Sequence, residues 1–347
     1  DTVKNGEFAG MKLSELYKTH RELFGNIQAE EFPLLVKIIN ADADLSIQVH
    51  PDDAYAREHE GCPYGKTECW YVMDCPEDAS LVIGHHAKTR EELARMIHED
   101  RYEELVRQMP VKKGDFIQIV PGTVHAIKGG FTILETQQSS DITYRVYDYH
   151  RLVDGKERPL HVQQSIDVIT VPDTSAEKAV SHTQDMPKDT VNELISCEFY
   201  KVYKVTVEKG VTVPMEGPFM LGSVLDGEGS IDGTPVKKGD HFILPAVYGD
   251  ATLTGSILYG KRDRKGQSMN YTIENEELIL VISSHGAEVR SLKDKKTGRE
   301  YMWCGDAAYW GRVSPVLFPI VGAVKNNTYR FKDKTYHMSQ HGFARDM

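Results

Sequence analysis

Long apolar runs and cysteine are scarce in this sequence of 347 residues, and its 41 basic residues are fewer than its 52 acidic ones. No stretch approaches the roughly 20 consecutive apolar residues that a membrane-spanning helix needs, so we expect no membrane partner. The formal net charge of −11 repels polyanions, which argues against DNA, RNA or an acidic lipid surface as a partner. No signal peptide is visible, so we expect a cytoplasmic protein. Because the chain begins with Asp1, we expect its natural start further upstream.

The few cysteines argue against a disulfide scaffold and against a zinc finger. Their number is odd and their spacing fits neither class, which predicts reduced thiols at Cys62, Cys69, Cys75, Cys197 and Cys304. Hydrophobic residues make up 40% of the chain and charged residues 27%, as is usual for soluble globular proteins. The length predicts two or three domains.

A nucleotide-binding loop is also absent, although "GCPYGKTECW" at residues 61–70 contains the Gly-Lys-Thr with which such a loop ends. That motif needs a glycine five positions before the Gly-Lys pair, but Gly61 lies only four positions before Gly65. The loop must also open a helix, whereas "ECWYVM" is typical of a strand. The motif therefore predicts a carboxylate, Glu68, at the start of a strand.

Short β runs dominate the chain and predict a mainly β fold. They include "PLLVKII", "LSIQV", "ECWYVM", "SLVIG", "DFIQIV", "FTILET" and "ITYRVYDY". One helix is expected over residues 11–25, ending at Gly25, and another in "TREELARMIHED", where Thr89 and Glu92 form a capping box. The polar stretch 171–192 predicts a linker or long loop.

An internal repeat links residues 111–126, "VKKGDFIQIVPGTVHA", with residues 236–251, "VKKGDHFILPAVYGDA". Each copy has a Gly-Asp turn, a hydrophobic strand and a proline-led turn, which predicts two similar small β-barrels. The second copy has no histidine in the place of His125; Tyr248 is nearby. We therefore expect metal only in the first barrel, and a second barrel filled by apolar side chains such as Phe242, Leu244 and Leu253.

Several residues with metal-binding side chains recur at strand-like spacing. Gln48 and His50 are two apart on a predicted strand and share one face, and Lys66 and Glu68 do so if their strand starts early enough. His125 follows a Pro-Gly turn. Two imidazoles and a carboxylate suit zinc or another divalent first-row ion, with the Gln48 amide as an unusual extra ligand. The alternative is that each is an ordinary hydrogen-bonded or solvated residue.

Four motifs in the same order resemble type I mannose-6-phosphate isomerases, particularly the short bacterial form: "SIQVHPDD", "YGKTECWYV", "VPGTVHAI" and "SSDITYRVYDY". The resemblance covers roughly residues 5–260 and implies a double-cupin fold with one Zn²⁺ per chain. It implies that the zinc ligands are Gln48, His50, Glu68 and His125. It also implies a catalytic arginine at Arg145, and it matches Lys66 to the lysine beside the metal-binding glutamate.

The resemblance implies an isomerase that interconverts mannose 6-phosphate and fructose 6-phosphate, so that the partner is a small sugar phosphate. A proton moves between C1 and C2 through an enediol, which a metal stabilises. The base is left open between a metal-bound water and Lys66. Two rival interpretations are a sugar-binding or regulatory cupin without catalysis and an iron-dependent cupin oxygenase, although such oxygenases usually present more histidines.

The C-terminal segment resembles the start of the aldose 1-epimerase family, whose members are galactose-mutarotase-like β-sandwiches, through "SPVLFPIVGAVKNNTYRF" and "QHGFARD". His341 matches that family's first substrate-polarising histidine and is the implied C-terminal sugar site. The family's later histidine and glutamate base do not occur in this sequence, so we expect no mutarotation. An incomplete sandwich would leave apolar residues partly exposed, such as Leu278, Leu280, Val316, Phe318 and Ile320.

These observations predict three domains. Residues 1–170 form the first cupin barrel with the metal site, and we expect its N-terminal part to be missing. Residues 171–262 form the second barrel, without metal. Residues 263–347, which begin within the basic linker "GKRDRKGQSMN" at 260–270, form a truncated mutarotase-like β-sandwich.

Overall fold

The computed structural model describes residues 1–215, 217–246, 248–263, 270–283, 288–303, 313–314, 325, 328–331 and 334–337. The chain is mainly β, as predicted, and divides into two units, Asp1–Lys265 and Gly266–Met347. Within the described residues, no helix is long and apolar enough to cross a membrane.

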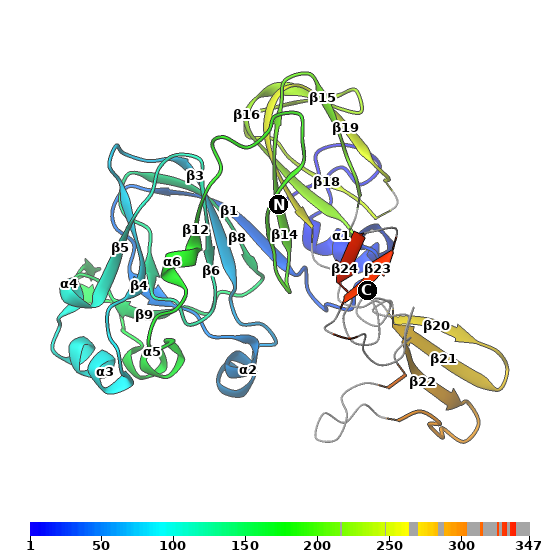
Figure 1. The fold of residues 1–347 in the computed structure, drawn as a ribbon, viewed down its shortest axis with the longest axis horizontal. Helices are drawn as coiled ribbons and strands as arrows, with labels where there is room; N and C mark the ends of the chain where they lie inside the picture. Colours follow the sequence, from blue (N-terminus) through cyan, green and yellow to red (C-terminus); the bar gives the residue numbers. More distant parts are fainter. Residues whose placement is uncertain are drawn as a thin grey trace. The chain divides into compact units, whose positions relative to one another are not determined.

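The first barrel consists of two five-stranded sheets that face each other (Figure 1). The β1 sheet has the strand order β1 (Leu34–Ala41), β8 (Phe131–Gln138), β3 (Glu68–Asp74), β6 (Asp115–Ile119) and β12 (Val180–His182). The β2 sheet has the order β5 (Val106–Pro110), β4 (Ser80–His85), β7 (His125–Ala126), β2 (Ile47–Val49) and β9 (Tyr144–Tyr147). Apolar side chains of both sheets, including Trp70, Ile117 and Ile83, form the core between them.

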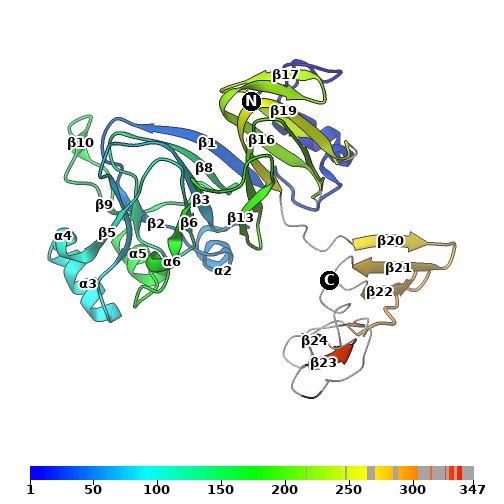
Figure 2. The same ribbon diagram turned by 45° about the horizontal axis from the view of Figure 1, so that its top comes forward.

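Helices cover the outer face of the β2 sheet (Figure 2). They are α3 (Arg90–His98), α4 (Tyr102–Leu105) and α5 (Val162–Val168). The predicted cap of α3 is confirmed, because the Thr89 hydroxyl accepts a hydrogen bond of 3.2 Å from the Glu92 amide. Leu93 and Ile97, one turn apart on α3, pack with Val49 from the outer face of β2. The other side chains of the β2 sheet therefore point inward, between the sheets.

The stretch 171–192 is more ordered than a linker, so that prediction is wrong. It contains α6 (Ala176–Ala179) and β12, which pairs with β6 and extends the β1 sheet. Thr183, directly after β12, is fully buried and donates to the Gly114 carbonyl at 2.6 Å. The polar composition of this stretch wrongly indicated a linker, because an edge strand such as β12 buries only part of its residues and tolerates polar side chains.

The predicted helix over residues 11–25 is two shorter helices. They are α1 (Leu13–Thr19) and the 3₁₀ helix η1 (Arg21–Phe24), separated by His20 in a non-helical conformation. The break brings Phe24 into edge contact with Tyr17 and with Phe219, which belongs to the second barrel. Gly25 ends η1 with a φ of 66°, and a side chain there would collide with Pro218. The N-terminal segment therefore packs on the second barrel.

The second barrel is built around a seven-stranded sheet (Figure 1). Its strands are β13 (Asn192–Ser196), β14 (Lys201–Val207), β15 (Gly210–Val213), β16 (Met220–Ile231), β17 (Thr234–Lys237), β18 (His241–Leu244) and β19 (Ala251–Asp263). Leu244 and Leu253 are buried in its core with Phe242 packed against them. Its β14 lies against the outer face of the β1 sheet, where Val202 packs with Cys69 and Phe116.

The repeated Val-Lys-Lys-Gly-Asp motif forms the same turn in both barrels. The glycine has a positive φ in each copy, 87° at Gly114 and 88° at Gly239. The carboxylates of Asp115 and Asp240 each accept a hydrogen bond of 2.9 Å from the lysine amide three residues earlier. The next strand begins at or directly after the aspartate in both copies, β6 and β18. The sequence repeat is therefore also a structural repeat, while the domain boundaries at 170 and 262 stay predictions.

Leu253→Ala is expected to destabilise the second barrel by about 2–5 kcal/mol, since it removes a buried side chain that is only 2% exposed. Chemical denaturation of both proteins measures the change. The matched control is Leu152→Ala in the β10–β11 hairpin (Leu152–Val153 and Lys156–Glu157), because that leucine is 66% exposed. Equal midpoints for the two variants would show that the apolar cluster around Leu253 does not stabilise the fold.

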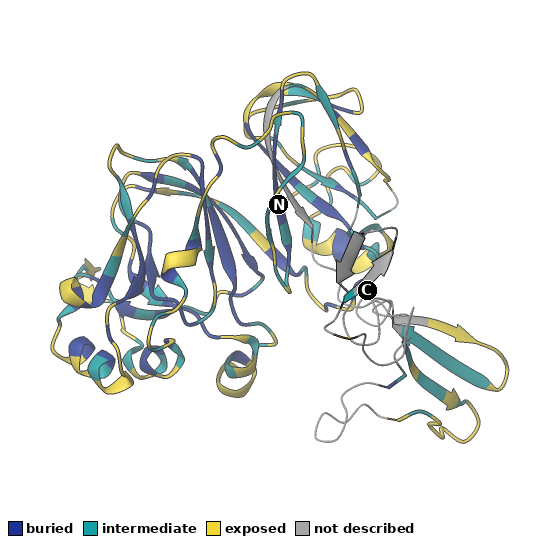
Figure 3. Cartoon of the chain, in the orientation of Figure 1, coloured by how far each residue is buried: buried dark blue, intermediate teal, exposed yellow. Residues whose placement is uncertain are grey.

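The second unit contains a three-stranded sheet of β20 (Asn270–Glu274), β21 (Leu278–Ser283) and β22 (Val289–Asp294), and a hairpin of β23 (Thr328–Phe331) and β24 (Lys334–His337). Leu278 and Leu280 are half-buried on β21, a strand that Figure 3 colours mainly as intermediate. The expected sugar-site residue His341 and the apolar residues Val316, Phe318 and Ile320 lie outside the described residues.

Candidate metal centre

Three of the predicted site residues form one row across the inner face of the β2 sheet. On β2, Gln48 lies opposite His125 of β7 and opposite Arg145 of β9. Residues directly opposite each other on paired strands share a face. The neighbours of Gln48 along the strand, Ile47 and Val49, belong to the outer apolar cluster, so Gln48 and its row point between the sheets.

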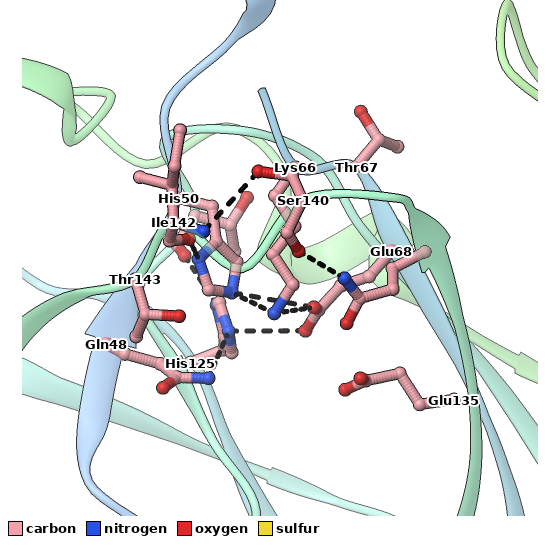
Figure 4. Close-up of polar contacts among 12 residues, drawn as sticks. Gln48, His50, Lys66, Thr67, Glu68, His125, Glu135, Ser140, Ile142 and Thr143 are labelled. Atoms are coloured by element: carbon pink, nitrogen blue, oxygen red, sulfur yellow. Dashed lines mark hydrogen bonds and ion pairs between the residues drawn. The ribbon is translucent and has the colours of Figure 1, made fainter. Parts of the chain in front are cut away.

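Glu68 faces this row from the β1 sheet. It is the first residue of β3, which lies between β8 and β6, and it is fully buried. The next inward residue on β3 is Trp70, whose ring packs edge-on against the His125 imidazole with 5.4 Å between the ring centroids. The site therefore lies in the interior of the first barrel, with ligand atoms from both sheets (Figure 4).

The segment between His50 and Lys66 leaves the barrel and returns to almost the same point. It forms α2 (Asp53–Tyr55) and a single π-helical segment, η2 (Ala56–Glu60). The chain closes where the Lys66 amide donates to the Pro51 carbonyl at 3.0 Å. A Cβ atom at Gly65 would lie 2.3 Å from the backbone carbon of Asp52, so only glycine permits this approach. This closure brings Lys66 beside His50, although β3 itself begins two residues later.

The ligand atoms of His50, Glu68 and His125 all lie within 4.8 Å of one another. His125 Nε2 is 3.3 Å from Glu68 Oε1, and His50 Nε2 is 3.5 Å from Glu68 Oε2. The Gln48 amide lies beside this group, with its Nε2 3.3 Å from His125 Nε2. Figure 4 shows these side chains converging on one point. No second group of this kind occurs in the described part of the chain.

Both imidazoles are held in the tautomer that a metal ligand needs. His50 Nδ1 donates to the Ile142 carbonyl at 2.9 Å, and His125 Nδ1 donates to the Thr123 carbonyl at 2.8 Å. The Nε2 lone pairs therefore point toward Glu68. Burial lowers the pKa of His50, and it lowers the pKa of His125 to about 3, so both rings stay neutral near pH 7. Neutral imidazole is the form that binds metals.

Glu68 is charged although it is completely buried. Burial alone would raise the pKa of this carboxyl, but the charge of the neighbouring Lys66 holds it well below its usual range. Lys66 Nζ lies 2.8 Å from Glu68 Oε2 and 3.1 Å from His50 Nε2. Beyond this ion pair, neither Glu68 oxygen accepts a hydrogen bond. A buried carboxylate with unsatisfied oxygens between two neutral imidazoles fits a divalent cation.

Arg145 is on the same inward row but is held by a different part of the chain. Its Nη1 donates to the Pro159 carbonyl at 2.7 Å, and its buried Nε has no hydrogen-bond partner. Burial, followed by the nearby Arg158, lowers the pKa of this guanidinium. The structure therefore places the predicted catalytic arginine on the inward row but at intermediate exposure, with an unsatisfied donor at its buried Nε.

Sequence reasoning did not single out Glu135. It lies on β8, opposite Trp70 of β3 and Lys37 of β1, and is only 3% exposed. Its carboxylate pairs with Lys37 Nζ at 2.8 Å and accepts from the Trp70 indole at 3.3 Å. Burial, followed by the Glu68 charge, raises its pKa. The signal that could have found it is a charged residue at an inward position of the apolar run "FTILET".

The chain matches three family models. The model of the phosphomannose isomerase type I catalytic domain matches residues 1–71, which include Gln48, His50, Lys66 and Glu68. The mannose-6-phosphate isomerase cupin domain matches residues 190–258. The aldose 1-epimerase family matches residues 269–347, and protein LacX of Lactococcus lactis is 37% identical over 82 residues, which cover 22% of this chain and 27% of LacX. The C-terminal match thus spans about a quarter of that relative.

The matches to relatives over the rest of the chain are much longer than this C-terminal match. The mannose-6-phosphate isomerase ManA of Bacillus subtilis is 48% identical over 258 residues, which cover 73% of this chain and 82% of ManA. A crystal structure of the mannose 6-phosphate isomerase from B. subtilis superposes with a TM-score of 0.71 at 41% identity, covering 75% of this chain and 84% of that one. The fold, the buried candidate metal site and these relatives agree: the chain belongs to the type I mannose-6-phosphate isomerase family.

Proposed function

We propose that this protein interconverts mannose 6-phosphate and fructose 6-phosphate with one Zn²⁺ ion in the first barrel. The observation that carries the proposal is the buried group of His50, Glu68 and His125, with neutral imidazoles and a charged carboxylate around one point. The ManA relative of B. subtilis supports the reaction, because its name assigns it this activity.

The metal would be held by four side chains: Gln48, His50, Glu68 and His125. Two nitrogen ligands, a carboxylate and an amide oxygen suit zinc or a neighbouring divalent ion. When bound, such an ion acts as a Lewis acid toward the sugar oxygens. The Nδ1 hydrogen bonds of the two histidines keep their rings oriented for this role.

Two cations of the chain act on the substrate. Lys66 is paired with Glu68 as an ammonium group, so it donates hydrogen bonds and stabilises negative charge on an enediolate oxygen. Arg145 carries a fixed charge and an unsatisfied buried Nε–H, so it holds an anionic oxygen of the substrate. Lys66 after proton loss is one candidate for the general base, and a water that a bound metal would hold is the other.

An isomerase assay coupled to fructose 6-phosphate, together with metal analysis of the same sample, tests the proposal. We expect turnover and about one zinc per chain, with both lost after chelation and restored by zinc. Sugar-phosphate binding without turnover would favour a non-catalytic cupin. Iron in place of zinc, with oxygen uptake on a substrate, would favour an oxygenase.

We also propose the three-part organisation with boundaries near residues 170 and 262. The family matches support it, since one begins at residue 190 and another at residue 269. Residues 263–347 would then be the first part of a mutarotase-like sandwich, with His341 in its sugar site.

A further inference from the structure

The strand that carries Arg145 lies at the edge of its sheet. β9 pairs with β2 on one side, and in the described part of the chain no strand pairs with its other side. An edge strand presents backbone N–H and C=O groups that need other partners. At Arg145 both groups find a partner in one residue, His161, the residue that precedes α5.

His161 pairs with the edge strand through both its ring and its backbone. The Arg145 amide N–H donates to His161 Nδ1 at 3.1 Å, and the His161 amide N–H donates to the Arg145 carbonyl at 2.8 Å. Two residues earlier, the Pro159 carbonyl accepts from Arg145 Nη1 at 2.7 Å. The segment 159–161 therefore holds both the backbone and the guanidinium of Arg145, and the imidazole takes the place of a strand carbonyl.

We propose that His161, in its neutral form, is a positioning residue that fixes Arg145 for catalysis. The inference rests on the proposed function, because the role of Arg145 belongs to that proposal. His161 does not act on the substrate; it acts through Arg145.

The hydrogen bond to the ring fixes its protonation state. An amide N–H can only donate, so His161 Nδ1 must be the unprotonated nitrogen, and the ring proton is on Nε2. Protonation of Nδ1 would turn two N–H groups toward each other and break the contact. It would also place a second cation beside the Arg145 guanidinium.

The surroundings of His161 favour the neutral ring. Burial, followed by the Arg145 charge, lowers its pKa from the ordinary value of 6.5, and the Glu60 carboxylate on η2 acts in the opposite direction. Tyr144, its other neighbour on β9, presents a ring whose hydroxyl donates to Glu60 at 2.8 Å. Because the folded-state pKa is depressed, the contact is intact near neutral pH and is lost as the pH falls below 6.5 through that lower value.

The ring has little freedom to follow a displaced strand. The His161 carbonyl accepts from both the amide and the hydroxyl of Ser165, at 2.9 and 2.7 Å. Ser165 and Ile166 of α5 are buried against the β2 sheet. His161 is therefore fixed to the helix layer, and a loss of its Nδ1 acceptor is not repaired by a shift of the segment.

The test compares His161→Asn with His161→Ala. An asparagine Oδ1 can take the position of Nδ1 as an acceptor but does not titrate, whereas alanine offers no acceptor. We expect His161→Ala to lower kcat about 10-fold or more with little change in zinc content, because displacement of a catalytic group by about 1 Å is costly. His161→Asn should retain most of kcat at neutral pH. His98→Asn, at the exposed end of α3, is the matched control.

The pH dependence separates positioning from a merely structural role. The ratio of kcat for His161→Asn to kcat for the wild type should rise as the pH falls below 6.5, because only the wild type loses the contact; taking the ratio cancels the titration of other groups. In the metal-free protein, the side-chain ¹⁵N spectrum should show His161 as the Nε2–H tautomer.

A ratio that stays constant with pH, wild-type kcat in His161→Ala, or a protonated Nδ1 in the neutral ring would each overturn the inference. The wild type and Arg145→Ala are assayed in the same series. An inactive wild type would refute the proposed function itself, whereas an active wild type that needs Arg145 but not His161 would refute only this inference.

Discussion

His50→Ala should remove the bound metal and the isomerase activity together. The substitution takes away one of the two imidazoles whose Nε2 atoms face Glu68. A metal acting as a Lewis acid contributes several kcal/mol to the stabilisation of developing charge, and about 1.4 kcal/mol corresponds to a tenfold change in rate. We therefore expect activity to fall by at least ~10³-fold. Metal analysis and the coupled assay on the same sample measure both effects.

The matched control is His98→Ala, at the exposed C-terminal end of α3 and outside the barrel interior. It should keep its zinc and its activity. Far-UV circular dichroism of both variants checks the fold, and we expect little change, because Lys66 and Glu68 still form their ion pair without His50. A His50→Ala protein with one zinc per chain and normal turnover would contradict the proposed ligand set.

Strand periodicity predicts well that Gln48 and His50 share one face, because the alternation of side chains along a strand is rigid. Gln48 and His50 are two apart, so the alternation that buries Ile47 and Val49 in the helix-covered cluster also decides the direction of the residues between them. The same rule places Arg145 inward between Tyr144 and Val146. Local alternation thus fixes which face a side chain occupies.

Contacts between distant segments could not be predicted in this way. Glu135 joins the site region because β8 lies between β1 and β3, a pairing that no local pattern encodes. Lys66 lies beside His50 only because the excursion through α2 and η2 closes on Gly65, whose need for close approach is visible only in the fold. The contact between His161 and Arg145 depends likewise on where the segment before α5 crosses the β9 edge of the β2 sheet. Each of these depends on tertiary packing.

Composition was the least reliable guide. The polar stretch 171–192 predicted a linker, yet β12 within it completes the β1 sheet and His182 pairs with the buried Asp115 at 2.8 Å. An edge strand can be polar because only one of its sides is paired. The N-terminal helix was predicted in one piece because its apolar stripe continues past His20. The fold instead uses the break to place Phe24 against the second barrel.

Arg145→Ala should abolish most turnover while leaving the metal in place. Arg145 shares the inward row with Gln48 and His125, but it is not among the three residues whose ligand atoms converge. A guanidinium is always protonated and offers no lone pair to a metal. Its buried Nε–H has no partner, so it is available to an anionic oxygen of the substrate. Loss of such a stabilising donor lowers kcat by roughly 10²-fold or more.

Arg145→Lys distinguishes charge from geometry. A lysine keeps the positive charge but has no planar fork, so it cannot donate to the Pro159 carbonyl and to a substrate oxygen in the same geometry. We therefore expect Arg145→Lys to recover only a small part of the lost kcat, with zinc content equal to that of the wild type. Leu152→Ala, in the exposed hairpin that follows β9, is the control for nonspecific effects near this strand. If Arg145→Ala lost zinc while keeping its turnover per remaining zinc, the arginine would serve the metal site and not the substrate.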